Sequence, residues 1–401
     1  MRKLLYISVI ILCLSVGGFW VWKFYSPAPA KPLHLKTFSF AKLPGWDAAD
    51  ALQSFKAFKI SCKTFLKQKP EKSVGSPYID VKAKDWHSAC QALSIKEPAT
   101  DKEAREFFET WFTPVLFHEN QPVRGLFTGY YMPVLEGNLT KTAKFNTPIY
   151  GLPNDRITIN LGLFDPSLKH HRKLIGRLQG KKLVPYYTRA QISKGAIAKS
   201  APVLAWISNK VDLQFLEIEG SGVVQLPDGK NLFLGYAGEN GAPYTSIARV
   251  LIDKGVMTKD NASMQRIRKY FKQHPKEVDK VLNKNKSFVF FNVLKQEAAL
   301  GSQGVPLTPG YSLAVDLKWV PIGTPIWLNT TRPDNAKKEA PFQRLMVAQD
   351  TGGAIRGAVR GDVYWGPGKE AAYIAGHMKN PGHYWLLLPK HIVGRLKDKI
   401  A

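Results

Sequence analysis

The chain has 401 residues, of which 44% are hydrophobic and 11% aromatic, and its formal net charge at pH 7 is +26. This length suits two domains or one large one, and the apolar content argues against a disordered chain. The positive charge favours a polyanionic partner: nucleic acid, anionic lipid or an acidic cell-wall polymer. Because no RNP, zinc-finger or basic-zipper signature is present, nucleic acid is not expected as a partner.

The first residues indicate export and membrane anchoring. Arg2 and Lys3 precede nineteen uncharged residues, Leu4 to Trp22. That length suits a membrane-spanning helix better than the shorter core of a cleaved secretion signal, which remains the alternative. Cys13 is not preceded by small residues, so lipid attachment there is not expected. The flanking positive charges place the rest of the chain on the outer side. We therefore expect residues 1–32 to form an anchor and a linker.

Two cysteines remain in the exported part, Cys62 and Cys90. In an oxidising compartment such a pair favours a disulfide, which would stabilise the fold by roughly 3–4 kcal/mol. Two buried free thiols are the alternative.

The N-terminal third is predicted to be helical. Apolar residues recur at helical spacing in two segments, and a capping-box pattern begins at Thr100. The expected helices cover residues 47–69, 85–93 and 101–112.

Strand character begins at Leu126, where β-branched and aromatic residues alternate with turn signals. Segment 216–226 predicts strands around a glycine bend, and the turn at 227–230 predicts a hairpin. A basic cluster runs over 169–173 and continues to Arg177, Lys181 and Lys182. Paired short strands return from residue 288 onward, which is typical of a small closed barrel.

Three aspartates follow apolar strands in the C-terminal third. Asp316 closes one strand, Asp350 ends the buried run Leu345–Ala348, and Asp362 lies among glycines and aromatics. Such positions suit a cleft wall that binds a polar ligand. On spacing alone, turn capping is the simpler interpretation.

Other chemistries lack their motifs. The histidine spacing fits no zinc site, and no G-x-S-x-G elbow, phosphate loop or dinucleotide fingerprint occurs, so neither a metal nor a cofactor is expected. The D-T-G sequence at Asp350 is the signature of pepsin-like proteases, which need two such carboxylates. With one copy in the chain, a protease would require a homodimer.

Several motifs occur together in the order typical of one family. They are Thr128-Gly129-Tyr130-Tyr131-x-Pro133, Glu219-Gly220-Ser221-Gly222, Tyr236-Ala237-Gly238-x-Asn240-Gly241, Gly304-Val305-Pro306-Leu307-Thr308 and the aspartates Asp316, Asp350 and Asp362. Over roughly residues 120–390 the chain resembles the membrane-bound lytic murein transglycosylase A family (MltA) with its C-terminal three-aspartate (3D) domain.

This resemblance implies a mainly β fold with N-terminal helices. A double-ψ β-barrel domain would combine the helical residues 33–131 with residues 296–401. An inserted β-rich domain would cover residues 132–295, with a glycan groove between the two domains.

The resemblance also implies an enzyme that cleaves the β-1,4 bond between N-acetylmuramic acid and N-acetylglucosamine without water, leaving a 1,6-anhydro end. Asp362 would be the catalytic acid/base, with Asp350 beside it and Asp316 as a third, supporting carboxylate. Candidate groove contacts are Thr128, Gly129, Tyr130, Ser221, Gln225 and Tyr236. The alternatives are a non-catalytic murein-binding protein and a hydrolytic glycosidase.

The expected location is the periplasmic face of the inner membrane. The expected partners are peptidoglycan glycan strands and the membrane, with envelope biosynthesis or division proteins as further candidates.

Overall fold

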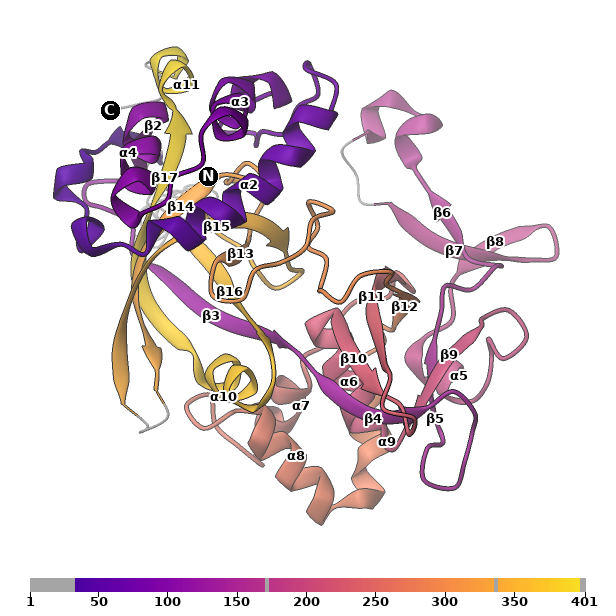
Figure 1. The fold of residues 1–401 in the computed structure, drawn as a ribbon. Coiled ribbons are helices and arrows are strands. Elements are labelled where there is room, and N and C mark those ends of the chain that lie inside the picture. Colours follow the sequence, from indigo (N-terminus) through magenta and orange to yellow (C-terminus); the bar gives the residue numbers. More distant parts are fainter. Residues whose placement is uncertain (1–32, 170–172, 335–337, 397–401) are drawn as a thin grey trace, which may run out of the picture.

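The computed structural model describes residues 33–169, 173–334 and 338–396. The anchor and linker expected over residues 1–32 lie outside this part. Within the described ranges, no helix combines the length and apolar character needed to cross a membrane. The chain forms two lobes (Figure 1): a barrel lobe built from both ends of the sequence, and an insert lobe over residues 134–293.

A closed β-barrel forms the centre of the barrel lobe. Among the described residues its six strands are β3 (Gly125–Met132), β13 (Ser312–Val315), β14 (Pro325–Pro333), β15 (Glu339–Thr351), β16 (Arg360–Pro367) and β17 (Lys379–Pro389). They pair in the order β17-β14-β15-β13-β16-β3, and β17 pairs again with β3, so the ring closes. The β3–β16 and β13–β15 pairs are parallel. Strands β1 (His34–Thr37) and β2 (Phe112–His118) extend the sheet beside β17.

Helices cover the outside of this barrel. They are α2 (Ala51–Lys67), α3 (His87–Ile95), α4 (Asp101–Trp111), α10 (Lys369–His377) and α11 (Lys390–Arg395). The first three agree with the predicted helices, whereas α10 and α11 lie in a region predicted to be mainly strands. Phe65 of α2 is fully buried and stacks on Trp86, with ring centroids 5.1 Å apart. Burial of such large apolar side chains supplies most of the favourable free energy of folding.

Cys62 of α2 and Cys90 of α3 form a disulfide, with 5.1 Å between their Cα atoms. Both residues are buried in the core of the barrel lobe. The bond closes a loop with a sequence separation of 28 residues. Such a loop restricts the unfolded chain more than the folded one.

Replacing both cysteines by alanine should therefore lower the free energy of unfolding by about 3–4 kcal/mol. Urea unfolding of the oxidised protein and of the double variant would measure the difference. As the control, a reductant should move the midpoint of the parent chain and leave that of the double variant unchanged. Equal midpoints for the oxidised and substituted proteins would contradict the prediction.

The insert lobe is built around a six-stranded sheet of the described chain, in the order β12-β11-β10-β4-β9-β5. Its strands are β4 (Val134–Asn138), β5 (Thr147–Tyr150), β9 (Val203–Ile207), β10 (Ser221–Gln225), β11 (Asn231–Glu239) and β12 (Val289–Val293). Its helices are α5 (Arg189–Ser193), α6 (Lys210–Glu219), α7 (Ile247–Asp253), α8 (Met264–Gln273) and α9 (Val278–Leu282). A separate small sheet contains β6 (Ile157–Ile159), β7 (Leu174–Gln179) and β8 (Lys182–Pro185). The chain passes from barrel to insert lobe between β3 and β4, at Pro133.

Short 3-10 helices complete the two lobes. They are η1 (Phe40–Lys42), η2 (Trp46–Ala48), η3 (Ala83–Trp86), η4 (Leu161–Leu163), η5 (Pro166–Leu168) and η6 (Pro275–Glu277).

The first half of the predicted strand pair at 216–226 is wrong, because residues 216–219 form the last turn of helix α6. The Asn209 side chain accepts a hydrogen bond from the Asp212 amide and so caps the helix N-terminus. Gly220 ends the helix with a φ of 76°, a left-handed conformation that glycine adopts readily. Strand β10 begins at the next residue. The last turn alternates apolar and acidic residues, a pattern that also predicts a strand. In the helix, Leu216 packs into the core of the insert lobe, and Glu219 contacts the barrel strand β3.

Candidate active site

A row of residues crosses four neighbouring barrel strands at one level. Asp362 of β16 lies opposite Thr128 of β3 on one side and opposite Ala314 of β13 on the other. Ala314 in turn lies opposite Asp350 of β15. Directly opposed residues point to the same face of a sheet, so both carboxyls share the face that carries Ala314. Two strand spacings place their backbones roughly 10 Å apart. Between them lies only the small side chain of Ala314, which is itself buried.

Asp362 is held by a short chain of hydrogen bonds. Thr128 donates its hydroxyl to Asp362 Oδ1 over 2.5 Å and accepts a hydrogen bond from Arg360 Nη2 over 2.8 Å. Burial raises the pKa of the Asp362 carboxyl, and nearby Asp350 raises it further, whereas Thr128 and the Arg360 charge oppose the shift. Asp362 therefore combines a fixed orientation with a pKa moved toward neutrality, as a general acid requires.

Asp350 is more completely hydrogen-bonded. Tyr130 donates its hydroxyl to Oδ2 over 2.8 Å, and the amides of Ser302 and Thr351 each donate to Oδ1 over 2.8 Å. Burial raises the pKa of Asp350, and these three donors oppose that rise. Because donors occupy both oxygens, Asp350 organises its surroundings: it fixes Tyr130 and the loop that follows β15.

Asp316 is not brought to the other two carboxyls by any contact of the described residues. Its Oδ2 accepts from the Gly357 amide over 2.9 Å, and its Oδ1 accepts from the Lys318 amide over 3.1 Å. Arg356 lies 3.7 Å from the same carboxylate. The side chain is buried and ties the loop after β15 to the end of β13. Asp316 therefore positions the loop between β15 and β16 through its hydrogen bond with the Gly357 amide.

Gly129 permits close packing beside the row. A Cβ at this position would lie 2.6 Å from Trp365 Nε1 and 3.0 Å from the backbone of Ala375 in helix α10. The indole N–H of Trp365 has no hydrogen-bond acceptor within the described part of the chain. A side chain at residue 129 would push both Trp365 and α10 away from β3.

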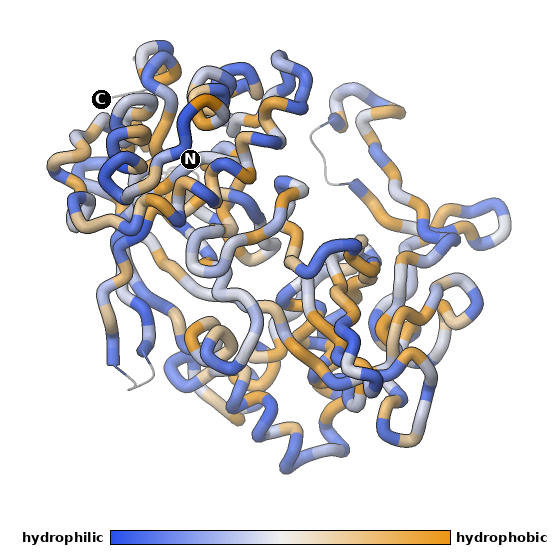
Figure 2. Tube along the Cα trace, viewed as in Figure 1, coloured by the Kyte–Doolittle hydropathy of each residue, from blue (hydrophilic) through white to orange (hydrophobic). Residues whose placement is uncertain are grey.

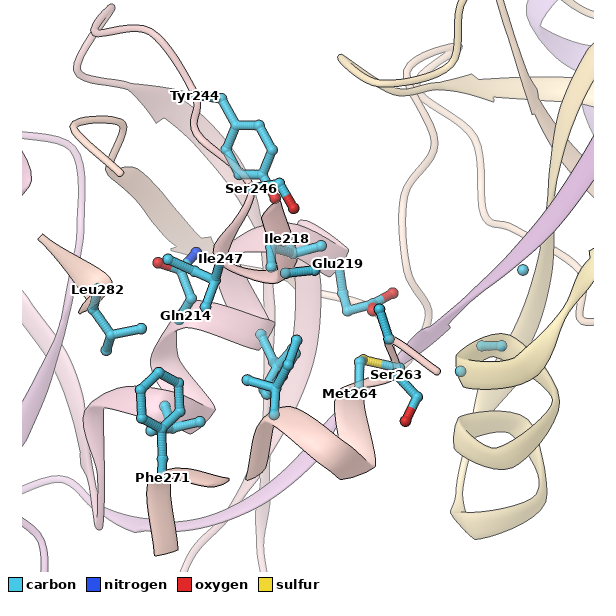
Figure 3. A pocket seen from close by; sticks show the side chains of 18 residues that line it. Gln214, Ile218, Glu219, Tyr244, Ser246, Ile247, Ser263, Met264, Phe271 and Leu282 are labelled. Carbon is cyan, nitrogen blue, oxygen red and sulfur yellow. The ribbon is translucent and has the colours of Figure 1, made fainter. Parts of the chain in front are cut away.

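A cavity of about 270 Å³ lies between the two lobes. Gly129, Ala375 and Gly376 line it from the barrel side, and residues of α6, α7 and α8 line it from the insert lobe. Figure 3 shows Glu219 extending from the end of α6 toward α10, with Ser263 and Met264 beside it. Most of the remaining lining is apolar, so a ligand here would lose much of its water.

Glu219 is the functional candidate that sequence reasoning missed. Its Oε2 accepts a hydrogen bond from the Tyr131 amide over 3.0 Å, so the insert lobe contacts strand β3 close to Thr128. Burial raises the pKa of Glu219 to about 8, the Tyr131 amide opposes the rise, and the negative charge of Asp362 adds to it. The family motif contained this glutamate, but nothing local indicates that a strand 88 residues away covers it.

This raised pKa predicts how stability depends on pH. Between pH 4.5 and about 8 the folded state keeps a proton on Glu219 that the unfolded chain releases. The contribution of this group therefore falls as pH rises through that window. Glu219→Gln keeps an acceptor for the Tyr131 amide and removes the titration. We expect its melting temperature to match the parent near pH 4.5 and to exceed it by about 2–5 °C at pH 8. Calorimetry from pH 4.5 to 8.5 measures both, and parallel curves would contradict the assignment.

Among the described hydrogen bonds, none joins the other predicted groove residues to a carboxyl of the row, so their role stays a prediction. Gln225 lines a separate cavity of about 340 Å³ that also contains Tyr364. Ser221 is buried at the start of β10, opposite Gly235. Tyr236 is exposed on β11, and among the described contacts none joins it or Ser221 to Asp362. Of the predicted contacts, Thr128 and Tyr130 hydrogen-bond Asp362 and Asp350, and Gly129 lies between them on β3.

Among the residues that the structure describes, no group of three or more His, Cys, Asp or Glu side chains could hold a metal ion. The row itself presents carboxyl, hydroxyl and guanidinium groups, from Asp362, Thr128 and Arg360.

The structure thus has two lobes: a closed barrel that carries Asp350 and Asp362 on strands β15 and β16, and an inserted lobe that contacts it. This arrangement is that of a protein with a 3D domain. The profile described as "3D domain" matches residues 311–388, and that of the "MltA specific insert domain" matches residues 126–292. The chain belongs to the MltA family, as the resemblance of its motifs predicted.

Relatives by sequence are membrane-bound lytic murein transglycosylase A of Escherichia coli K12, 36% identical over 265 residues, and that of Vibrio cholerae, 33% identical over 266. Each match covers 65% of this chain and 65% of the relative. The matched part thus spans slightly less than two thirds of these relatives.

Solved structures of the family match over a greater length. MltA from Neisseria gonorrhoeae (monoclinic form) is 34% identical, with a TM-score of 0.76, over 90% of this chain and 96% of that one. Membrane-bound lytic murein transglycosylase from Agrobacterium tumefaciens is 30% identical, with a TM-score of 0.78, over 90% and 99%. E. coli MltA with bound chitohexaose is 27% identical, with a TM-score of 0.65, over 89% and 94%. The predicted fold class, a mainly β protein with a barrel and an inserted domain, is confirmed.

Proposed function

We propose that the protein is a lytic transglycosylase that cleaves the β-1,4 bond between N-acetylmuramic acid and N-acetylglucosamine in peptidoglycan. The observation that carries the proposal is Asp362, a carboxyl of raised pKa that Thr128 orients on the barrel face beneath the insert lobe. The relatives named lytic murein transglycosylase A support the reaction, and the relative with bound chitohexaose supports a glycan as the ligand.

In the proposed first step, protonated Asp362 donates its proton to the glycosidic oxygen. The bond from that oxygen to the anomeric carbon breaks, and positive charge develops on the muramyl ring as an oxocarbenium-like species. In the second step, the Asp362 carboxylate accepts the proton of the sugar's own C6 hydroxyl. The C6 oxygen bonds to the anomeric carbon, which gives the 1,6-anhydro end and restores the protonated acid. No water is consumed.

The hydrogen bonding of Asp350 supports this single-acid scheme over hydrolysis. A hydrolytic glycosidase needs a second carboxylate, free either to activate water or to attack the sugar. Both Asp350 oxygens already accept hydrogen bonds, from Tyr130, Ser302 and Thr351. In the proposed mechanism Asp350 raises the pKa of Asp362 through its charge and holds Tyr130 at the edge of the site, and Asp316 holds the loop between the two strands.

We further propose that the enzyme acts in the cell envelope, on glycan strands bound between the lobes. The name "membrane-bound" of the relatives supports envelope association. Residues 1–32 would anchor the chain at the periplasmic face of the inner membrane, and a cleaved secretion signal is the alternative that N-terminal sequencing of the mature protein would reveal.

Mass spectrometry of the muropeptides released from purified murein tests this function. Products with 1,6-anhydro-muramic acid ends are the expected result. Reducing-end products that incorporate ¹⁸O from labelled water would instead establish hydrolysis. Murein binding without any soluble product would leave a wall-binding protein and reject the enzyme.

A further inference from the structure

An arm with a small sheet of its own projects from the insert lobe (Figure 1). It consists of β6, the short helices η4 and η5, and the hairpin β7–β8. These strands pair only with one another within the described sheets, in the order β6-β7-β8. The arm also carries described residues of the basic cluster, among them Lys169, Lys173, Lys181 and Lys182. The proposed reaction assigns no role to these positive charges.

One face of this sheet is apolar and uncovered. Leu178 of β7 lies opposite Leu183 of β8, and Leu174 lies opposite Ile159 of β6. Opposed residues and alternate residues along a strand share a face, so these four side chains lie together. Leu174, Leu178 and Leu183 are 48%, 63% and 48% exposed. Figure 2 shows the hydrophobic segments of the arm alternating with hydrophilic ones.

The opposite face attaches the arm to the lobe. Ile175 packs against the apolar core of the insert lobe. The Arg177 guanidinium lies over the Tyr187 ring, 4.1 Å from its centroid. The leucine face therefore points away from the core of its own lobe.

The 3-10 helix η4 and its C-cap residue, which follow β6, add two more exposed apolar side chains to the arm. Leu163 is 82% exposed and Phe164 is 80% exposed, and they are adjacent. Two neighbouring bulky apolar side chains fully in water are costly unless they bind something. The adjacent Asp165 caps η5 by accepting a hydrogen bond from the Ser167 amide over 2.8 Å.

Positive charge surrounds the apolar face. Lys169, Lys173, Lys181 and Lys182 lie in the turns and strands of the arm, and the sequence from 166 to 185 contains no acidic residue. For the four lysines, no ion pair with an acidic side chain occurs among the described residues.

We propose that the arm binds the surface of an anionic lipid bilayer, with Leu163, Phe164 and the leucine face entering the headgroup region and the lysines contacting anionic headgroups. Leucine and phenylalanine beside lysine are the composition of interfacial membrane binders. A glycan rich in hydroxyls is bound mainly through polar and aromatic side chains, whereas this face is mainly aliphatic.

The anchor expected near the N-terminus keeps the bilayer within reach. Ten residues, 23–32, separate the apolar stretch Leu4 to Trp22 from the described chain, and ten extended residues span at most roughly 33–36 Å. The arm would be a second membrane contact and would fix how the two lobes face the membrane.

Site-directed spin labelling of the full chain in proteoliposomes tests this proposal. In a Cys13→Ser background, a nitroxide is attached at Phe164→Cys, and its collision rates with oxygen and with a water-soluble nickel complex are compared. In vesicles with about one third phosphatidylglycerol, the label at 164 should favour oxygen, as lipid-embedded labels do. In pure phosphatidylcholine it should remain accessible to nickel, because lysines lose their attraction to a neutral surface.

A matched control is available on the barrel lobe. Ile95 is also apolar and 86% exposed, but it stands alone, so a label at Ile95→Cys should remain in water in both lipids. Lys181→Glu with Lys182→Glu should return the label at 164 to water in anionic vesicles.

Three results would overturn the proposal. The first is a label at 164 that stays aqueous in anionic vesicles. The second is a label that murein fragments immobilise but lipid does not. The third is a label protected without lipid in a chain that sediments as a dimer, which would assign the face to a second copy. Unchanged muropeptide release by the lysine variant in detergent keeps this test separate from the proposed reaction.

Discussion

Asp362→Asn should lower muropeptide release from murein by about 10²–10⁴-fold, the range that positioned acid–base groups contribute. The amide has nearly the same shape and can still accept the Thr128 hydrogen bond, but it cannot protonate the glycosidic oxygen or accept the C6 hydroxyl proton. The measurement is the initial rate of anhydro-muropeptide release, with murein co-sedimentation to show that binding persists.

A matched control separates this effect from a general loss of charge. Asp228→Asn makes the same chemical change at the exposed turn between β10 and β11, where the carboxylate accepts a hydrogen bond from the Lys230 amide. Its rate should stay within about twofold of the parent, because surface changes of this kind alter stability little. A rate for Asp362→Asn close to that of Asp228→Asn would remove Asp362 from the mechanism and direct attention to Glu219.

Arg189→Met should destabilise the insert lobe by about 3–5 kcal/mol, the usual effect of leaving one partner of a buried pair uncompensated. Arg189 and Glu217 are both almost completely buried. Arg189 Nη1 donates to Glu217 Oε1 over 3.0 Å, and Arg189 also donates to the carbonyls of Asn285 and Ser287. The pair joins α5, α6 and the segment before β12. Denaturant unfolding followed by circular dichroism measures the change.

The double variant Arg189→Met with Glu217→Leu provides the comparison. Replacing both charges with apolar groups should recover most of the lost stability, because the cost arises from an unpaired carboxylate and less from the missing attraction. If the double variant is no more stable than Arg189→Met, the hydrogen bonds from Arg189 to the carbonyls of Asn285 and Ser287 matter more than the charge. Since Glu217 lies two residues before Glu219, loosening the pair should also displace that carboxyl and slow muropeptide release.

The apolar run before Asp350 marked that residue in the sequence, whereas the roles of Asp316, Asp350 and Asp362 were predicted only from the resemblance to the MltA family. The run before Asp350 is an internal barrel strand, and the glycines after it form the loop that Asp316 holds. Local patterns of this kind depend only on neighbouring residues, so they are readable in one sequence. The paired short strands predicted a barrel, but they did not predict which strands pair with one another.

The parallel contact of β3 with β16 could not be predicted from local patterns. It joins Thr128 to Asp362 across 234 residues, and nothing near either residue specifies the other. For the same reason the surroundings of Ser221 and Tyr236 could not be predicted: they lie opposite Gly235 and Phe291 in the insert lobe, and their role as groove contacts stays a prediction. Glu219 was missed because its burial comes from another lobe.

Helix α6 shows how local and tertiary preferences can disagree. Its last turn alternates apolar and acidic residues, and a strand pattern follows directly, so period-two spacing suggested a strand on each side of the glycine bend. The caps at Asn209 and Gly220 decide the structure, and burial of Glu217 against Arg189 accounts for an acidic residue on the inner face. From sequence alone, a buried charged residue can be predicted only when the residue that pairs with it is known.

The order in which the barrel strands occur along the chain limits when this protein can become active. The insert lobe lies wholly within residues 134–293 and has a core of its own, so its contacts can form as soon as that segment is available. The barrel closes only when β17, near the end of the chain, pairs with β3. Contacts of such sequence separation form late, because a long loop must be ordered first. A chain interrupted before residue 379 would hold all three aspartates and still lack the closed ring around them. Synthesis of β17 therefore comes before closure of the ring that holds the site.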